Sequence, residues 1–417
     1  MANVSSSNSQ GELVPKLRFP EFEGEPYHSE TVGTLFDHAS RRNSGGSNGN
    51  VITNSAEHGL IPQRDFFDKD IAVEGNTSNY YVIKKGDFVY NPRKSSSAPY
   101  GPFNCYRLED EGIVSPLYTC LTPKHEEYTE FLLWYFKSPA WYSYIYHNGA
   151  QGGARHDRVG MTNELMDGIP VNLPCLQEQE KISIFLSALD RRIDAQRKLV
   201  DALKSYKRGV LSVLFPQDGD TVPCSRFGGF DRPWTLYKFS DFTWASGTRN
   251  KDNLDLEPYA ITNEHGFIRQ SEAHEEFGYM KDTDRRAYNI VKPHSFAYNP
   301  ARINVGSIGY YDGSENVIVS SLYEVFQTTD FVDDRFLWHW FKSDEFPKWI
   351  EKLQEGSVRL YFYYDKLCEC QILLPSVVEQ RRIANYLDSI DMLIESNQRV
   401  FKSMLSVRRS LLQQMFI

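Results

Sequence analysis

The sequence predicts an α+β protein in which two similar mixed α/β domains are separated by two long helices. Landmark sequences of the first half recur in order in the second half, and each half ends in a stretch with the heptad spacing of a coiled coil. Antiparallel pairing of the helices would give a dumbbell with a pseudo-twofold axis. The expected segments are a domain over 1–174, a central helix over 175–216, a second domain over 217–375 and a distal helix over 376–417.

Six ordered pairs of landmarks carry the internal repeat, at shifts that drift from 208 to 201 residues. The pairs are Arg18-Phe19 with Arg226-Phe227, Tyr90-Asn91-Pro92 with Tyr298-Asn299-Pro300, Val114-Ser115 with Val319-Ser320, Phe136-Lys137-Ser138 with Phe341-Lys342-Ser343, Leu173-Pro174 with Leu374-Pro375, and Glu178-Gln179 with Glu379-Gln380. Small loop insertions in a duplicated domain produce such a drift. Two unrelated domains would not keep the order.

The globular part of each copy mixes strands with one helix. β-Branched and aromatic runs between Gly, Pro and Asn turns predict strands, for example over 80–83 and 88–90. A helical pattern covers 130–136 in the first copy and 335–341 in the second. The aromatic run over 361–364 favours a strand with alternate rings buried, and an exposed stacking platform is the alternative.

The two predicted helices share one heptad frame. Polar residues interrupt the apolar core positions at the same places in both. The core positions of this frame are Ile182, Leu186, Leu189, Ile193, Gln196, Val200, Leu203, Val210 and Leu214 in the first helix, and Ile383, Leu387, Ile390, Ile394, Asn397, Phe401, Met404, Leu411 and Met415 in the second. Lys207 and Arg408 also occupy equivalent positions. Polar residues in such positions fix register and partner. The alternative is that each helix merely covers its own domain.

The composition and the net charge exclude several classes of protein. Apolar residues make up 41% of the chain, enough for folded cores, and no run approaches a membrane span, so we expect a cytoplasmic protein. The six cysteines lack zinc spacing, which favours buried free thiols and no metal; Cys368 and Cys370 would share one face of a strand. A net charge of −9 excludes a uniformly positive surface. Any DNA contact must therefore use local basic loops.

Taken together, these motifs resemble the DNA-specificity subunits of type I restriction-modification systems. The likeness rests on Arg18-Phe19-Pro20-Glu21-Phe22, the Tyr-Asn-Pro and Val-Ser-x-Leu-Tyr segments, and the Leu-Pro then Glu-Gln-x-x-Ile helix starts, and it covers nearly the whole chain. The resemblance implies two target-recognition domains that read the halves of a split, asymmetric site in double-stranded DNA. It also implies helices that set the spacing and dock two modification subunits. Those partners would use S-adenosylmethionine to methylate adenine N6, and restriction/translocase subunits can join; this chain would hold no cofactor.

Motifs that the sequence lacks favour a non-catalytic chain. It contains no Pro-Pro pair, which the active site of adenine methyltransferases needs, and no Glu-x-Lys or Asp-x-Lys nuclease tripeptide. A GxxxxGK[ST] phosphate loop, which a translocating motor needs, is also missing. We therefore expect a recognition subunit rather than an enzyme.

Candidate DNA-reading residues fall in two regions of each copy. Sequence-specific readers use Arg, Lys, Asn and Gln for base edges and phosphates. The candidates are Asn91, Arg93, Lys94, Ser95, Gln151, Arg155 and Arg158 in the first copy, and Asn299, Arg302, Asn304, Arg359 and Tyr361 in the second. The Tyr-Asn-Pro segments are alternatively structural turns, and the arginines solvated or bound to the helices. The copies differ most around these loops, as domains that read different sequences would.

Two other functions remain open at this stage. A duplicated protein-binding adaptor unrelated to restriction would explain the two domains and the acidity, but not the shared motifs. An enzyme fused into the same polypeptide would need the catalytic motifs that are missing.

Overall fold

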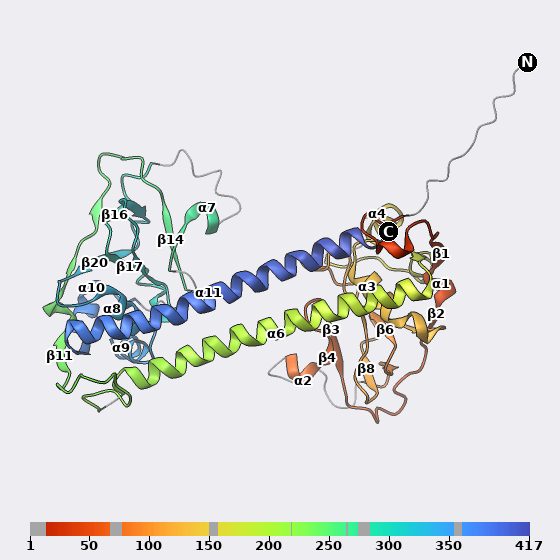
Figure 1. Cartoon of the computed structure of the whole chain (residues 1–417), viewed down its shortest axis with the longest axis horizontal. Coiled ribbons are helices and arrows are strands. Elements are labelled where there is room, and N and C mark those ends of the chain that lie inside the picture. The colour runs from red at the N-terminus through yellow and green to blue at the C-terminus, as the bar shows by residue number, and fades with distance from the viewer. Residues whose placement is uncertain are drawn as a thin grey trace, which may run out of the picture. The chain divides into compact units, whose positions relative to one another are not determined.

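The computed structural model describes residues 14–66, 77–149, 157–217, 219–263, 266–273, 284–353 and 361–417. The chain forms two compact units: 1–196 with 400–417, and 197–399. Each unit contains parts of both long helices, α6 (Leu176–Leu214) and α11 (Val377–Gln414), coloured yellow-green and blue in Figure 1. The predicted mixed α/β class with two long helices is confirmed.

The first unit contains short strands, short helices and the first half of α6. Its strands are β1 (His28–Thr31), β2 (Phe36–His38), β3 (Ile52–Ser55), β4 (Gly59–Pro62), β5 (Tyr81–Ile83), β6 (Phe88–Tyr90), β7 (Phe103–Cys105), β8 (Gly112–Val114), β9 (Thr119–Pro123) and β10 (Pro170–Leu173). Its short helices are α1 (Val32–Leu35), α2 (Gln63–Phe66), α3 (Thr129–Lys137), α4 (Tyr142–Asn148) and α5 (Asn163–Asp167). An antiparallel sheet of order β2-β9-β6-β7 is central to the unit.

The second unit repeats this plan almost element for element. Its strands are β11 (Thr235–Lys238), β12 (Thr243–Ala245), β13 (Thr248–Arg249), β14 (Tyr259–Thr262), β15 (Gly266–Arg269), β16 (Asn289–Val291), β17 (Ser295–Tyr298), β18 (Ile308–Tyr311), β19 (Val317–Val319), β20 (Glu324–Thr328) and β21 (Gln371–Leu374). Its short helices are α7 (Gln270–Ala273), α8 (Asp334–Phe341), α9 (Glu345–Leu353) and α10 (Tyr364–Glu369). The sheet of order β12-β20-β17-β18 corresponds to that of the first unit, so the internal repeat is structural.

Each central sheet separates a large core from a small one. Side chains alternate between the two faces of a strand, so Phe88 and Tyr90 enter the large core of the first unit while Val89 enters the small core. In the second unit, Phe296 and Tyr298 enter the large core and Ala297 the small one. Each large core also packs against the long helices, which anchors the sheets to them.

Within each unit, the two long helices run antiparallel. In the first unit, Ile182 and Leu186 of α6 share a core with Leu412 and Met415 at the far end of α11. The ring of Phe416 lies 5.4 Å from that of Phe131. The last backbone carbonyl, that of Ile417, accepts a hydrogen bond of 2.8 Å from Asn172 Nδ2. The C-terminal residues are therefore part of the core of the first unit.

The second unit pairs the other halves of the same helices. Val210 and Leu214 of α6 share a core with Ile383 and Leu387 of α11. No helix among the described residues is long and apolar enough to cross a membrane.

Two predictions about the cysteines were wrong. Cys368 lies in α10 and Cys370 follows it, so neither belongs to a strand. Cys224 is exposed, although Cys105, Cys120 and Cys370 are buried and all six thiols are free.

Candidate nucleic-acid interface

The loop that follows β6 starts from a firmly held turn. Tyr90 is fully buried, and its hydroxyl donates to the carbonyl of Tyr100 at 2.7 Å. Asn91 Nδ2 donates to the carbonyl of Asn54 and to the Tyr118 hydroxyl, at 3.3 and 3.4 Å. Its Oδ1 accepts from the backbone N–H of Arg93 at 3.0 Å, as in an Asx turn. Both the nitrogen and the oxygen of the Asn91 side-chain amide thus form hydrogen bonds within the protein.

Gly101 closes the same loop by a close backbone approach. Its φ is +87°, and a Cβ at this position would lie 2.1 Å from the carbonyl oxygen of Asn91. Only glycine tolerates both conditions, so the shape of the loop is fixed at its start and at its end.

A second segment pairs with this loop and brings three cations together. The N–H of Lys94 donates to the carbonyl of Asp157 at 2.8 Å, and that of Val159 to Pro92 at 2.9 Å. Arg93 and Arg158 face each other as an isolated antiparallel bridge. The predicted residues Arg93, Lys94 and Arg158 are therefore brought together, although 149–158 and 91–97 are far apart in sequence.

These cations differ in exposure. Arg93 and Lys94 are exposed, whereas Arg158 is half-buried. Among the described residues, no group accepts a hydrogen bond from the buried Nε of Arg158. Ser95, also predicted, is exposed, and its hydroxyl accepts from the N–H of Ala98 at 3.1 Å.

The loop after β17 in the second unit has the same construction. Asn299 Oδ1 accepts from the N–H of Ala301 at 3.0 Å, and Phe362 donates its N–H to the carbonyl of Pro300 at 3.1 Å. Of the predicted residues here, Arg302 and Asn304 are exposed. The chain then turns through a 3₁₀ helix, Ile303–Val305.

Tyr361 and Tyr363 form a stacked pair beside this loop. Their ring centroids lie 5.5 Å apart and their planes differ by 4°. The strand predicted over 361–364 was wrong, because α10 begins at Tyr364 and only Phe362 of the preceding three residues is buried. Tyr363 was not among the candidate DNA-reading residues, but it belongs to the stacking platform that was the alternative over 361–364.

Three predicted residues, Gln151, Arg155 and Arg359, lie outside the described residues.

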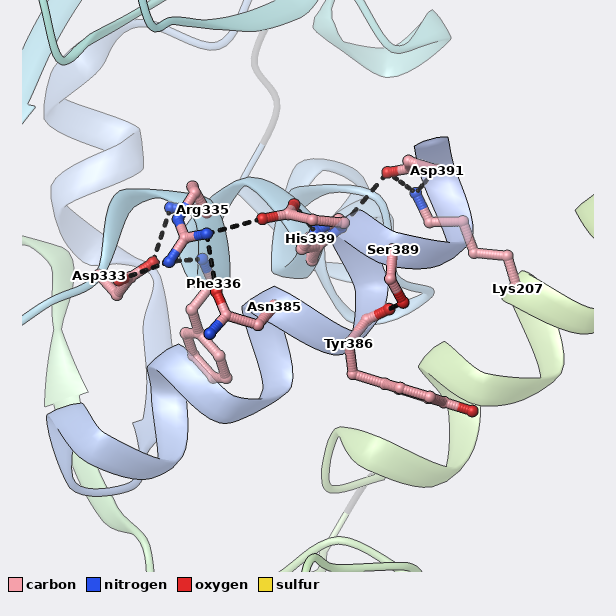
Figure 2. Close-up of polar contacts among 10 residues, drawn as sticks. Lys207, Asp333, Arg335, Phe336, His339, Asn385, Tyr386, Ser389 and Asp391 are labelled. Carbon is pink, nitrogen blue, oxygen red and sulfur yellow. Dashed lines mark hydrogen bonds and ion pairs between the residues drawn. The ribbon is translucent and has the colours of Figure 1, made fainter. Parts of the chain in front are cut away.

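In the second unit, polar side chains join α8 to α11 (Figure 2). His339 is fully buried, and its Nε2 lies 2.8 Å from Asp388 Oδ1. Arg335 donates at 2.9 Å to Asp388 and to Asn385. Burial lowers the pKa of His339 below 6.5, despite the opposing effect of the Asp388 hydrogen bond. The imidazole is therefore mainly neutral at pH 7.

A lysine pair lies next to this junction. Lys207 of α6 donates to both carboxylate oxygens of Asp391 at 2.5 Å. Burial, followed by repulsion from Lys207, lowers the pKa of Lys342 to about 8. Asp391 thus pairs with Lys207, and its charge also opposes the lowering of the pKa of Lys342.

The first unit has a less charged version of the junction. Trp134 Nε1 donates to the hydroxyl of Ser187 at 3.2 Å, where His339 and Asp388 stand in the second unit. Lys137 lies 3.6 Å from Asp190, which also pairs with Arg408 of α11. Equivalent helix positions thus carry equivalent ion pairs, Asp190 with Arg408 and Asp391 with Lys207.

The predicted heptad positions are all buried or half-buried in α6 and α11. Asn397 Nδ2 donates to the carbonyl of Leu393 in the preceding turn at 2.8 Å. Because the cations at 207 and 408 each meet an aspartate of the opposite helix, a shift of register would separate four charges from their partners.

A cleft of about 1060 Å³ lies in the second unit between the β-rich part and α11. Its charged lining residues are Asp312, Asp330, Asp333, Asp334, Asp388, Asp391 and Glu395, against Arg335 and Arg381. The excess of carboxylates would repel DNA phosphates. We therefore place the candidate DNA interface at the loops. Among the described residues, no three His, Cys, Asp or Glu side chains are grouped to hold a metal ion.

Comparison with known proteins gives a consistent picture. The family model for the type I restriction modification DNA specificity domain matches residues 43–205 and 266–402. The specificity subunit of the type I restriction enzyme MjaVIII from Methanocaldococcus jannaschii is 22% identical over 260 residues. That alignment covers 57% of this chain and 58% of the relative, so the chain spans less than two thirds of the curated relative it matches.

Two solved structures share the fold over almost the full chain. The S subunit of a type I restriction-modification system from M. genitalium matches with a TM-score of 0.54 at 11% identity, covering 97% of this chain and 99% of its own. A chain from a study of complex assembly and conformational transition in a type I R-M system matches with a TM-score of 0.55 at 16% identity, covering 93% and 96%. The family model matches more than half of the chain, so this chain belongs to the type I restriction-modification DNA specificity family.

Proposed function

We propose that this chain reads a split, asymmetric DNA site, one half with each unit. The observation that carries the proposal is the repeated construction of the two loops. Both begin with the same Asx turn after the same strand of the same sheet, yet Arg93 and Lys94 in one are replaced by Ala301 and Arg302 in the other. One scaffold with different exposed side chains suits two half-sites of different sequence.

The residues of these loops are assigned different roles. Asn91 and Asn299 hold the turns, since their side chains accept from the backbone two residues later. Arg93, Lys94, Arg158 and Arg302 contact phosphates or base edges, as guanidinium and ammonium groups do. The predicted contacts of Ser95, Asn304, Gln151, Arg155, Arg359 and Tyr361 belong to the same proposal.

The chain acts within a larger complex. Two modification subunits dock on it and methylate adenine N6 with S-adenosylmethionine, and restriction/translocase subunits join for cleavage. The net charge of −9 supports this role for partners, because few phosphates can be neutralised by this chain alone.

Single-molecule mapping of methylated adenines tests the proposal directly. A strain carrying this gene with its modification gene should show one split motif, methylated on both strands, that disappears when this gene is deleted. Unchanged methylation by an active modification subunit would contradict the proposal and favour the protein-binding adaptor.

A chimaera assigns each half-site to a unit. Residues 227–374 are replaced by the equivalent residues 19–173, so both units carry the first recognition domain. The expected motif keeps one half-site and gains an inverted copy of it in place of the other. A motif that stays asymmetric would show that the units do not read the half-sites separately.

A further inference from the structure

Backbone hydrogen bonds identify which residues of the two units are equivalent beside the loops. In the first unit Val159 donates its N–H to Pro92, and in the second Phe362 donates to Pro300. Pro92 and Pro300 follow the equivalent asparagines of the two Asx turns. Tyr361 therefore stands where the first unit has Arg158, and Tyr363 where it has Gly160, an equivalence that the differing lengths of the segments hide in the sequence.

The side chains at these equivalent positions differ in chemistry between the two units. The first unit presents Arg158 beside Arg93 and Lys94, all donors of hydrogen bonds. The second presents two parallel rings, with Ala301 in the place of Arg93. Phe362 lies between the two tyrosines in the sequence. Its side chain is buried in the large core and so anchors the pair there.

Of the two stacked rings, that of Tyr363 is exposed and that of Tyr361 is half-buried. Tyr363 is 50% exposed, and an exposed aromatic surface next to a buried anchor is typical of a contact site. In the major groove the apolar group on base edges is the 5-methyl of thymine, which side chains recognise by apolar contact. Arginine instead suits guanine, whose O6 and N7 accept a pair of hydrogen bonds.

We propose that Tyr361 and Tyr363 recognise the 5-methyl group of thymine in the half-site read by the second unit. This inference rests on the proposed function. It adds which base is recognised in that half-site and which residues recognise it. The half-site read by the first unit depends on cations and is indifferent to thymine methyl groups at this position.

Deoxyuridine substitution tests the proposal, because it removes only the methyl group. The complete complex with modification subunits is given duplexes in which each thymine of the mapped motif is replaced in turn by deoxyuridine. Loss of one methyl contact is expected to weaken binding about fourfold. The loss should be confined to the half-site that the chimaera assigns to the second unit.

Variants of the tyrosines connect the effect to the residues. Tyr361→Ser and Tyr363→Ser should weaken binding to the thymine duplex by a similar factor and show no further loss with deoxyuridine. Tyr363→Phe keeps the ring and should keep the methyl discrimination. Tyr146→Ser, which removes an exposed tyrosine of the first unit, is the matched control and should leave that discrimination unchanged.

The outcomes separate this proposal from the one on which it rests. A split motif whose second half-site lacks thymine, or tolerates deoxyuridine at every position, overturns the methyl contact while leaving the specificity function intact. The same holds if the serine variants retain full methyl discrimination. Absence of any split motif would instead contradict the proposed function itself.

Discussion

Gly101 is the residue on which the first candidate loop depends most directly. We expect Gly101→Ala to destabilise this loop by roughly 1–3 kcal/mol, because a Cβ cannot fit 2.1 Å from the Asn91 carbonyl at a φ of +87°. Methylation mapping should show lost recognition of the half-site that we propose for the first unit.

Gly49→Ala is the matched control for this substitution. Nothing lies within 4 Å of its added Cβ, and its φ lies outside the left-handed region. Equal effects of the two substitutions would contradict the role given to Gly101.

At the same scale, we expect the stability of the second unit to depend on pH because of the buried imidazole of His339. Burial lowers its pKa below 6.5 in the folded chain, so the unfolded chain binds more protons as the pH falls below 6.5. The stability from this residue is present above pH 6.5 and decreases toward pH 5. Urea denaturation at several pH values measures this slope.

The first unit supplies the control. His339→Trp with Asp388→Ser installs the pair found as Trp134 and Ser187, neither of which titrates in this range. The double variant should lose less stability between pH 6.5 and 5 than the original chain. An identical slope would mean that other groups cause the dependence.

At the scale of elements, a buried ion pair joins the β-rich part of each unit to the first turn of a long helix. Arg18 donates through Nε and Nη2 to Glu178 at 2.8 and 2.7 Å, and Arg226 does the same to Glu379 at 2.6 and 2.7 Å. The phenylalanine that follows each arginine packs edge-on against an aromatic ring of the same helix. The repeated Arg-Phe motif is therefore an anchor.

Removal of one charge from this anchor should be costly. Glu379 is 1% exposed, so Glu379→Gln leaves Arg226 without its carboxylate, and we expect a loss of about 3 kcal/mol. Chemical denaturation measures it. Glu369→Gln, which removes an exposed carboxylate from its pair with Lys366, should change the stability by less than ~1 kcal/mol; equal losses would argue against the anchor.

The sequence predicts local elements better than it predicts contacts between them. Heptad positions such as Leu186 and Leu387 follow from the period of a helix, and strands such as β6 from alternating residues. The strand expected over 361–364 was wrong because burial of Phe362 alone, and not of alternate rings, decides that segment. The pairing of Lys94 with Asp157 depends on the tertiary fold.

At the scale of the whole chain, the net charge of −9 limits the DNA contacts to few cations. In the complex with modification subunits, Arg93→Ala and Lys94→Ala should each reduce the slope of log binding constant against log salt concentration by about one. Lys85→Ala is the control, since Lys85 precedes β6 and pairs with Glu109. A slope unaffected by Arg93 and Lys94 would remove both from the interface.

The contribution of the C-terminal residues to the first unit has a genetic consequence. The ring of Phe416 contacts those of Phe131 and Tyr135, and the backbone carbonyl of Gln414 accepts a hydrogen bond from the N–H of Leu17. Removal of residues 415–417 would thus damage a unit that is built mainly from residues 1–196. Nonsense and frameshift mutations in the codons for these residues should therefore abolish the recognition that we propose for the first unit, and a transcript truncated before them could not supply a working first unit.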